Sequence, residues 1–279
     1  MKALLSAALT LAVLTGCAAQ APEPTATSAG KDPQEANEVK WKLERAKADC
    51  MKKKGFKYIP FVMAGPAETE TQKRMAAGDY AATKEFRTKY GYQVFAQYIY
   101  PNDSASGALV TEEFGEDPNS KVAMNETQFN AFKSAKNACS TKAFKAVLNA
   151  DVKDPLDVLK LQRDLSGRLT ARRLDGDAEL VKLAVTFGDC LKAKGYPITS
   201  LKPTDLAKRG ETATYAEIDK LGPGSSGSSP DLTAAQAKPH FAKEVKDALD
   251  DLECGKEFYA RFSPIYTAIR QEVKAQIPL

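Results

Sequence analysis

The chain has 279 residues, a length that fits one large domain or two modest ones. Hydrophobic residues make up 43% of it and charged residues 27%, so the composition excludes a wholly disordered protein and supplies enough apolar material for a core. The 40 Lys and Arg residues nearly balance the 36 Asp and Glu residues, and a formal net charge of +4 gives no indication of a nucleic-acid-binding protein.

The chain opens with the pattern of an export signal. Lys2 is followed by a mostly apolar stretch, residues 3–14, which is too short to span a bilayer but has the length of a signal-peptide core. The run Leu-Thr-Gly-Cys that ends at Cys17 resembles the lipobox of bacterial lipoproteins. That resemblance implies that residues 1–16 are a removable signal peptide and that Cys17 carries acyl chains such as palmitate. The alternative is an ordinary secretory signal with an incidental cysteine.

Residues 17–31 contain Ala, Pro, Thr and Ser but no large apolar side chain. Such a segment cannot bury itself, so we predict an acylated Cys17 followed by a disordered tether. Several acyl chains on one residue meet the requirement for stable membrane anchoring. The sequence therefore predicts a protein held at the outer face of the cell membrane by its lipidated N-terminus.

Two stretches that each contain a cysteine are nearly identical. DCMKKKGF, residues 49–56, and DCLKAKGY, residues 189–196, agree at five of eight positions and lie 140 residues apart. We interpret them as an internal duplication, with one half over residues 32–150 and the other over residues 151–279. In both stretches lysines occupy the last turn of an apolar helical pattern, and a glycine follows where a left-handed C-cap is favoured. Each copy predicts an amphipathic helix, a glycine stop and a short extended segment.

The other two mature cysteines also follow helix-start signals. Cys139 lies in an apolar pattern that begins after a capping residue at Asn125. Cys254 lies in a pattern that follows a capping box at Thr233, although Pro239 indicates that the main helix starts there. Each half therefore contains an early helix and a late helix with one cysteine apiece.

An even number of cysteines in an exported chain indicates disulfides. Four cysteines allow three connectivities, and the simplest one pairs them within each half, Cys50 with Cys139 and Cys190 with Cys254. We therefore predict that these cysteines are structural links and not nucleophiles. The expected fold class is mainly α: a disulfide-stapled helical protein with short extended segments and two duplicated halves.

The repeated cysteine motif behind a lipobox resembles short motifs in uncharacterised exported lipoproteins of actinomycete-type bacteria. The resemblance covers only the signal and the two motif copies, residues 49–56 and 189–196. Those proteins have no agreed activity. The resemblance therefore implies the location and the disulfide scaffold and leaves the chemistry open.

Recognisable catalytic and cofactor motifs are absent from the sequence. His240 is the only histidine and no G-x-S-x-G element accompanies it, so we expect an exposed or capping residue. No G-x-G-x-x-G or P-loop predicts a nucleotide, and we expect no cofactor and no metal. Residues 175–177 begin like a calcium loop, but Leu180 and Thr186 stand where glycine and glutamate are required, which favours a helix cap.

Two acidic clusters provide the alternative to a non-catalytic protein. The run Glu112–Asp117 and the carboxylates of Asp247, Asp250, Asp251 and Glu253 could hold the pair that a glycosidase uses. Charged loops and helix faces commonly have the same composition, and sequence does not give the distance between two carboxyl groups. An envelope hydrolase using paired carboxylates is therefore the alternative function.

One segment is unusually aromatic, because seven aromatic residues lie between Tyr80 and Tyr100. The candidate binding residues are Tyr90, Tyr92, Phe95, Tyr98 and Tyr100. A tyrosine ring has an apolar face and a polar tip, which suits a surface that binds glycans or another protein. The other interpretation is that the segment is the apolar lid of a small helical core. We hypothesise a non-catalytic binding or structural module of the cell envelope, whose partner is a cell-wall polymer or another exported protein.

Overall fold

A computed structural model of the chain describes residues 33–63, 68–108, 117–120, 123–225 and 229–278. The expected signal peptide, the lipidation site Cys17 and the tether lie outside the described residues. The ten α-helices of the described residues are α1 (Pro33–Lys53), α2 (Glu70–Ala76), α3 (Tyr80–Tyr90), α4 (Ala96–Ile99), α5 (Glu126–Leu148), α6 (Leu156–Thr170), α7 (Ala178–Ala193), α8 (Pro203–Asp219), α9 (Ala234–Cys254) and α10 (Lys256–Gln276). A short 3-10 helix, Ser104–Ser106, follows α4, and a π-helical turn, Ala171–Asp175, follows α6.

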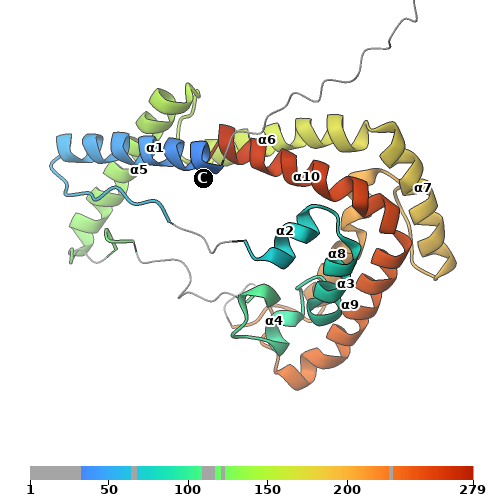
Figure 1. Ribbon diagram of the computed structural model, residues 1–279. Coiled ribbons are helices and arrows are strands. Elements are labelled where there is room, and N and C mark those ends of the chain that lie inside the picture. Colours follow the sequence, from blue (N-terminus) through green and yellow to red (C-terminus); the bar gives the residue numbers. More distant parts are fainter. Residues whose placement is uncertain (1–32, 64–67, 109–116, 121–122, 226–228, 279) are drawn as a thin grey trace, which may run out of the picture.

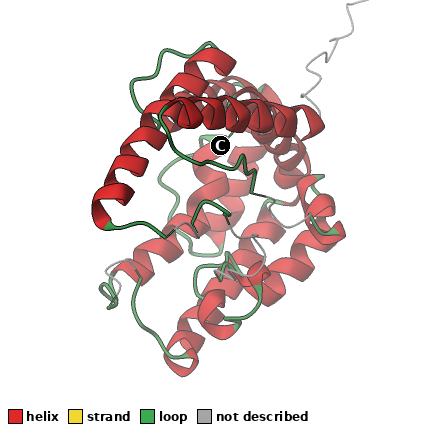
Figure 2. Cartoon of the chain, turned by 90° about the vertical axis from the view of Figure 1, so that its left-hand side faces the viewer, coloured by secondary structure: helices red, strands yellow, loops and turns green. Residues whose placement is uncertain are grey.

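Within these ranges the protein has no β-strand, and loops connect the helices (Figure 2). The fold class is therefore mainly α, as the sequence predicted. The two segments that were expected to be extended, residues 56–62 and 196–201, are loops without strand pairing. Each of these loops carries the chain away from the end of a cysteine-bearing helix.

The helices form two packed groups, which we call the arm and the body. The arm consists of α1 and α5, which pack against each other and are joined by the disulfide Cys50–Cys139, with a Cα–Cα distance of 5.5 Å. The body consists of α2 to α4 and α6 to α10 and contains the disulfide Cys190–Cys254, also with a Cα–Cα distance of 5.5 Å. Helix α10 runs from the body to the arm, where it contacts α1 (Figure 1). Both predicted disulfides are present.

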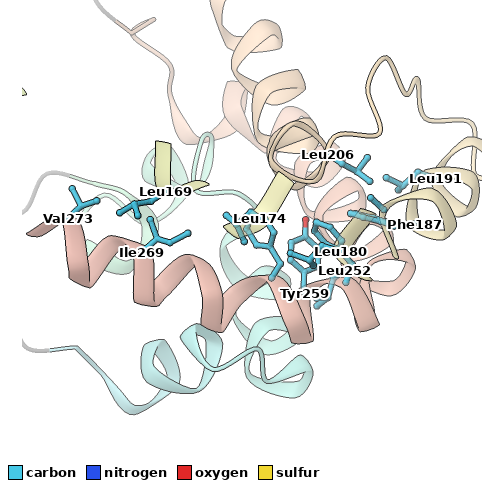
Figure 3. Close-up of a cluster of buried hydrophobic side chains, with 13 residues drawn as sticks. Leu169, Leu174, Leu180, Phe187, Leu191, Leu206, Leu252, Tyr259, Ile269 and Val273 are labelled. Atoms are coloured by element: carbon cyan, nitrogen blue, oxygen red, sulfur yellow. The ribbon is translucent and has the colours of Figure 1, made fainter. Parts of the chain in front are cut away.

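A continuous apolar cluster holds α6, α7, α8, α9 and α10 together in the body (Figure 3). Phe187 of α7 contacts Phe258 and Tyr259 of α10, with ring centroids 5.3 Å and 5.6 Å apart. Further along α10, the buried side chain of Ile269 belongs to the same cluster as Leu169 of α6. Each fully buried large apolar side chain contributes about 1.5–3 kcal/mol, so this cluster is the main source of stability in the body.

Helices α2, α3 and α4 belong to the first predicted half but pack in the body. Helix α3 packs against α9, and α2 packs against α10. Two hydrogen bonds mark these contacts: Tyr80 Oη donates to Glu253 Oε2 over 3.1 Å, and Thr267 Oγ1 donates to the carbonyl of Ala76 over 3.3 Å. The predicted halves therefore intermix in space, and their origin by duplication remains a prediction.

The two copies of the cysteine motif adopt the same local structure. Gly55 and Gly195 both have left-handed backbone, with φ of 82° and 88°. The closing hydrogen bonds are Phe56 N to Met51 O at 3.0 Å and Gly55 N to Lys52 O at 3.0 Å in the first copy, and Tyr196 N to Leu191 O at 3.0 Å and Gly195 N to Lys192 O at 2.9 Å in the second. This is the Schellman pattern, so the glycine stop predicted for each helix is confirmed.

The capping residues that the sequence indicated do begin helices, whereas the start indicated by a proline does not. Capping boxes begin α5 at Asn125 and α9 at Thr233, and Asp177 caps α7. The prediction that the main helix starts at Pro239 is wrong, because α9 begins at Ala234 and the proline lies inside it. The proline removes one backbone donor, but the reciprocal hydrogen bonds of the capping box already fix the first turn.

Candidate functional site

An open cleft of about 1330 Å³ lies where α2, α3, α6, α8 and α10 meet. The loop between α3 and α4 also reaches it, through Gly91, Tyr92 and Gln93. Pockets for small molecules typically measure about 300–1,000 Å³, so this cleft has room for a ligand larger than a single small molecule.

Aromatic rings and uncharged hydrogen-bonding groups make up much of the lining. The rings are those of Phe86, Tyr92, Tyr259, Phe262 and Tyr266. The amides and hydroxyls are those of Gln72, Gln93, Gln162, Gln271, Ser166, Ser263, Thr83, Thr170, Thr204 and Thr267. Apolar ring faces beside many hydrogen-bond donors and acceptors suit a ligand whose units each have an apolar face and polar edges, as the rings of a sugar chain do.

The wall formed by α6 and α10 carries only positive charge. Arg163 of α6 and Arg270 and Lys274 of α10 line it and are exposed, and neither helix contributes a carboxylate to the lining. Among the described residues, none of these three cations has a carboxylate within ion-pair distance. The nearby carboxylate of Glu272 is already paired with Arg173, at 2.8 Å, and lies outside the cleft. This wall is therefore electrostatically uncompensated.

A buried ion pair lies beneath the loop that reaches the cleft. Arg87 of α3 donates through Nη1 to Asp251 Oδ2 at 2.8 Å and to the carbonyl of Ala248 at 2.9 Å, both on α9. Tyr259 Oη donates to the same carboxylate oxygen at 2.6 Å. Burial and the negative charge of Asp251 raise the pKa of Tyr259, so its hydroxyl remains a donor. These bonds fix α3 to α9 and α10.

A buried carboxylate holds the loop itself. Glu244 of α9 is 2% exposed and accepts backbone N–H bonds from Tyr92 at 2.7 Å, Val94 at 3.0 Å and Phe95 at 2.8 Å. Gln93, with φ of 71°, gives the backbone the bend that points these donors at one group. Burial raises the pKa of Glu244, and the N–H groups of the loop oppose that rise by stabilising the carboxylate. Glu244 therefore sets the position at which Tyr92 and Gln93 reach the cleft.

The five aromatic residues predicted as a binding surface lie mostly inside the body. Phe95 is 0% exposed and Tyr90 is 7% exposed, so neither ring offers a surface to a ligand. Tyr98 Oη donates to the carbonyl of Pro230 at 3.0 Å, and the ring of Tyr100 packs edge-on against Phe241. Their positions match the lid interpretation, in which the segment covers apolar surface on α9.

Only Tyr92 among those five residues lines the cleft. Its hydroxyl donates to Asp247 Oδ1 at 3.1 Å, and its ring packs against Gly210 of α8 so closely that a Cβ there would lie 1.9 Å from the hydroxyl oxygen. Burial and the neighbouring charges of Asp251 and Asp247 raise the pKa of Tyr92. Tyr92 is thus a rigid part of the cleft and is not a mobile surface ring.

His240 has a packing role that the sequence did not predict. Its ring stacks on Phe95, with centroids 5.1 Å apart, and Nδ1 lies 2.5 Å from Oε1 of Glu217 on α8. The expectation of an exposed or capping histidine is therefore wrong, because Pro239 lies inside α9 and the following residue faces the packed side of the helix.

Of the four carboxylates on α9 considered for the hydrolase alternative, three are engaged in ion pairs, Glu253 accepts a hydrogen bond from Tyr80, and none lines the cleft. Arg209 of α8 contacts both Asp247 and Asp251. Asp250 is bound by Lys194 at 2.9 Å, by Lys246 at 2.6 Å and by Tyr196 Oη at 2.7 Å. In the other acidic cluster, residues 112–116 lie outside the described residues.

The arm contains a smaller groove of a different character. It measures about 520 Å³ and lies between α1, α5 and the loop after α1. Its lining is mainly apolar and includes Leu43, Phe61, Val62, Met63 and Phe144. Lys40, at the edge of this groove, has a pKa below its ordinary value because of burial and the positive charge of Lys274.

Comparisons of the chain with protein-family models, with curated proteins and with solved structures found no match. In the described part of the chain, none of the helices combines the length and the apolar character needed to cross a membrane. The part of the chain that the structure describes also contains no cluster of three or more His, Cys, Asp or Glu side chains suited to a metal ion.

The sequence pattern does not single out the three cations of the α6–α10 wall. Arg163, Arg270 and Lys274 stand on ordinary amphipathic helices among many other exposed cations. The only local signal is that Arg270 and Lys274 are like charges four positions apart, an arrangement that a free helix does not favour.

Proposed function

We propose that this is an exported, lipid-anchored protein of the bacterial cell envelope that binds a cell-wall polymer in the cleft and acts without catalysis. The proposed location rests on the lipobox-like run that ends at Cys17. It is supported by the pairing of the other four cysteines in two disulfides, which persist in oxidising compartments outside the cytoplasm.

The observation that carries the proposed binding role is the cleft of about 1330 Å³. It is open, so a polymer longer than the cleft can pass through it. Its rings and its amide and hydroxyl groups match the alternating apolar faces and hydroxyl edges of a sugar chain. Buried hydrogen bonds hold the contributing loop in place, so little ordering cost is expected on binding.

A non-catalytic role is favoured over the hydrolase alternative by the placement of the carboxylates. Asp247 and Asp251 are bridged by Arg209, and Asp251 is also held by Arg87 and Tyr259. Both carboxylates are occupied by these partners and neither lines the cleft, so neither is placed to reach a ligand bound there.

Filling the cleft from Gly167 tests the proposal. Gly167 lies within α6 and lines the cleft, and a Cβ placed there has no other atom within 4 Å. Gly167→Trp therefore puts a large ring into open space, and replacing a helical glycine favours the helix. Gly167→Ala is the matched control because it makes the same backbone change without the bulk.

The assay is co-sedimentation of the full chain, in mild detergent, with purified bacterial cell-wall sacculi. We expect saturable binding by the wild type and by Gly167→Ala, and a loss of at least about tenfold in affinity for Gly167→Trp. Absence of binding by the wild type, or equal binding by the tryptophan variant, would contradict the proposal.

A further inference from the structure

We propose that the ligand of the cleft is an anionic polymer, whose phosphate or carboxylate groups lie along Arg163, Arg270 and Lys274. This inference rests on the proposed function and specifies the chemical class of its ligand. The rings and amides of the cleft suit a sugar chain, and the positive charges of the α6–α10 wall favour a chain that is also anionic.

The three cations lie on one wall because α6 and α10 are packed together. Gln162 Nε2 donates to the carbonyl of Ile277 over 3.1 Å, which places the neighbouring Arg163 beside the last turns of α10. Arg270 and Lys274 lie one turn apart on α10, about 6 Å along the helix axis. A chain that carries regularly spaced negative groups can contact all three.

Two other cations of the cleft are already paired, whereas Lys208 of α8, which also lines the cleft, has no ion pair among the described residues. Arg87 is paired with Asp251 at 2.8 Å, and Lys202 is paired with Asp175 at 3.4 Å. On α8, the charge of Lys208 is flanked by two cleft-lining carboxylates, Asp205 and Glu211, whereas neither α6 nor α10 contributes a carboxylate to the lining. The field across the cleft therefore favours an anion on the α6–α10 side.

The positive wall is unfavourable in the empty protein. Like charges at positions i and i+4 of a helix repel each other, and Arg270 and Lys274 stand in this relation. The positive charge of Lys274 also acts on Lys40 in the arm and, together with burial, lowers the pKa of Lys40. An anionic ligand removes this repulsion, so part of the binding free energy comes from relief of a cost that the empty protein carries.

The test compares two variants with the same change in net charge. The wall variant is Arg163→Gln, Arg270→Gln and Lys274→Gln. The control variant is Arg168→Gln, Arg172→Gln and Lys182→Gln, which removes exposed cations that do not line the cleft and have no ion pair in the described structure. Thermal unfolding of both variants establishes that they fold, since no ion pair among the described residues is broken in either.

Binding of the full chain is measured with three defined probes: poly(glycerol phosphate), polygalacturonate and the uncharged polymer dextran. We expect binding to one or both anionic probes, weakening as ionic strength rises, and at least about tenfold weaker binding for the wall variant than for the control variant. Binding to poly(glycerol phosphate) alone identifies phosphate as the recognised group, and binding to polygalacturonate alone identifies carboxylate.

Equal binding by the two variants, or dextran binding as tight as that of the anionic probes, would overturn this inference. In that case, binding to sacculi that Gly167→Trp abolishes would leave the proposed function standing with an uncharged ligand. If the anionic probes bind and intact sacculi do not, the anion site is supported and the wall polymer as its natural ligand is contradicted.

Discussion

The arm and the body contain the same cysteine motif but embed it differently. The two copies share the glycine cap, the disulfide distance and, over residues 49–60 and 189–200, the same order of buried, partly buried and exposed positions. In the body, Lys194 and Tyr196 of the motif both bind Asp250 on α9. In the arm, Lys54 has no ion pair in the described structure, and Phe56 has no hydroxyl with which to make such a bond.

The surrounding cores differ still more. The second copy belongs to the apolar cluster that runs through α6, α7, α8, α9 and α10. The first copy has a small cluster whose buried members are Met51, Phe132, Ala135 and Cys139. An eight-residue motif therefore determines its own helix end, whereas its tertiary partners determine how firmly that end is held. The cleft is built on the firmly held region.

The largest effect is expected from breaking the link between α3 and the body. Arg87→Ala leaves Asp251 buried with one fewer cationic partner, which typically costs about 3–5 kcal/mol. Denaturant unfolding measures this loss. Lys89→Ala is the control, because its pair with Asp103 is exposed and its loss is expected to cost far less stability. Equal effects of the two substitutions would show that the aromatic segment is not fixed to the body through Arg87.

Removing the disulfides one at a time separates the arm from the body. Loss of either disulfide is expected to lower the free energy of unfolding of the group of helices that contains it by about 2–4 kcal/mol. Without Cys50–Cys139, we expect faster hydrogen exchange confined to α1 and α5, because the arm core is small. Without Cys190–Cys254, we expect a lower unfolding temperature of the whole body. The reverse distribution of exchange would refute the division into arm and body.

The shared cap predicts equal costs in both copies. Gly55→Ala and Gly195→Ala each place a Cβ at a left-handed position with no other atom within 4 Å, so only backbone strain is added. That strain is about 1–2 kcal/mol per residue. Unfolding of the two variants is expected to give losses that agree within about 0.5 kcal/mol. A clear difference would mean that the caps are not equivalent.

The smallest effect concerns the contact that only the second copy makes. Burial alone would raise the pKa of Asp250, but hydrogen bonds from Lys246, Lys194 and Tyr196 outweigh it and hold the pKa well below the ordinary value of 3.8. This contribution to stability is therefore present above pH 3.8 and is lost as the pH falls below it. Between pH 6 and pH 3 we expect the wild type to lose up to about 1 kcal/mol more stability than Asp250→Asn. Parallel pH profiles would contradict this account.

The parts of the fold that were predictable from sequence are those that depend on neighbours in the chain. The glycine after each lysine-rich turn and the capping residues Asn125 and Thr233 act through hydrogen bonds within a few residues. The disulfide pairing was also predictable, because the duplicated motif favoured one of three connectivities. The helix start predicted at Pro239 is wrong because proline is common at the first position of helices in general, whereas the capping box at Thr233 sets the start of this helix earlier in the chain.

The candidate site was not predictable because it depends on contacts between distant segments. Glu244 holds the loop at Tyr92 from a position about 150 residues away in the chain. Nothing in the sequence indicates that Phe95 turns inward while Tyr92 reaches the cleft. Arg163 and Arg270 likewise become one wall only when α6 packs on α10. Composition marks the segment as aromatic, but it does not give the direction in which each ring points.

The central claim is that the body, through its cleft, carries the binding function. Hydrogen exchange of the full chain, measured with and without solubilised cell-wall fragments, tests it most directly. The account predicts slower exchange on binding in the cleft-lining turns of α6 and α10, around Gly167 and Arg270, with no change in α1 and α5. Slower exchange confined to α1 and α5 would place the binding site in the arm and contradict the account.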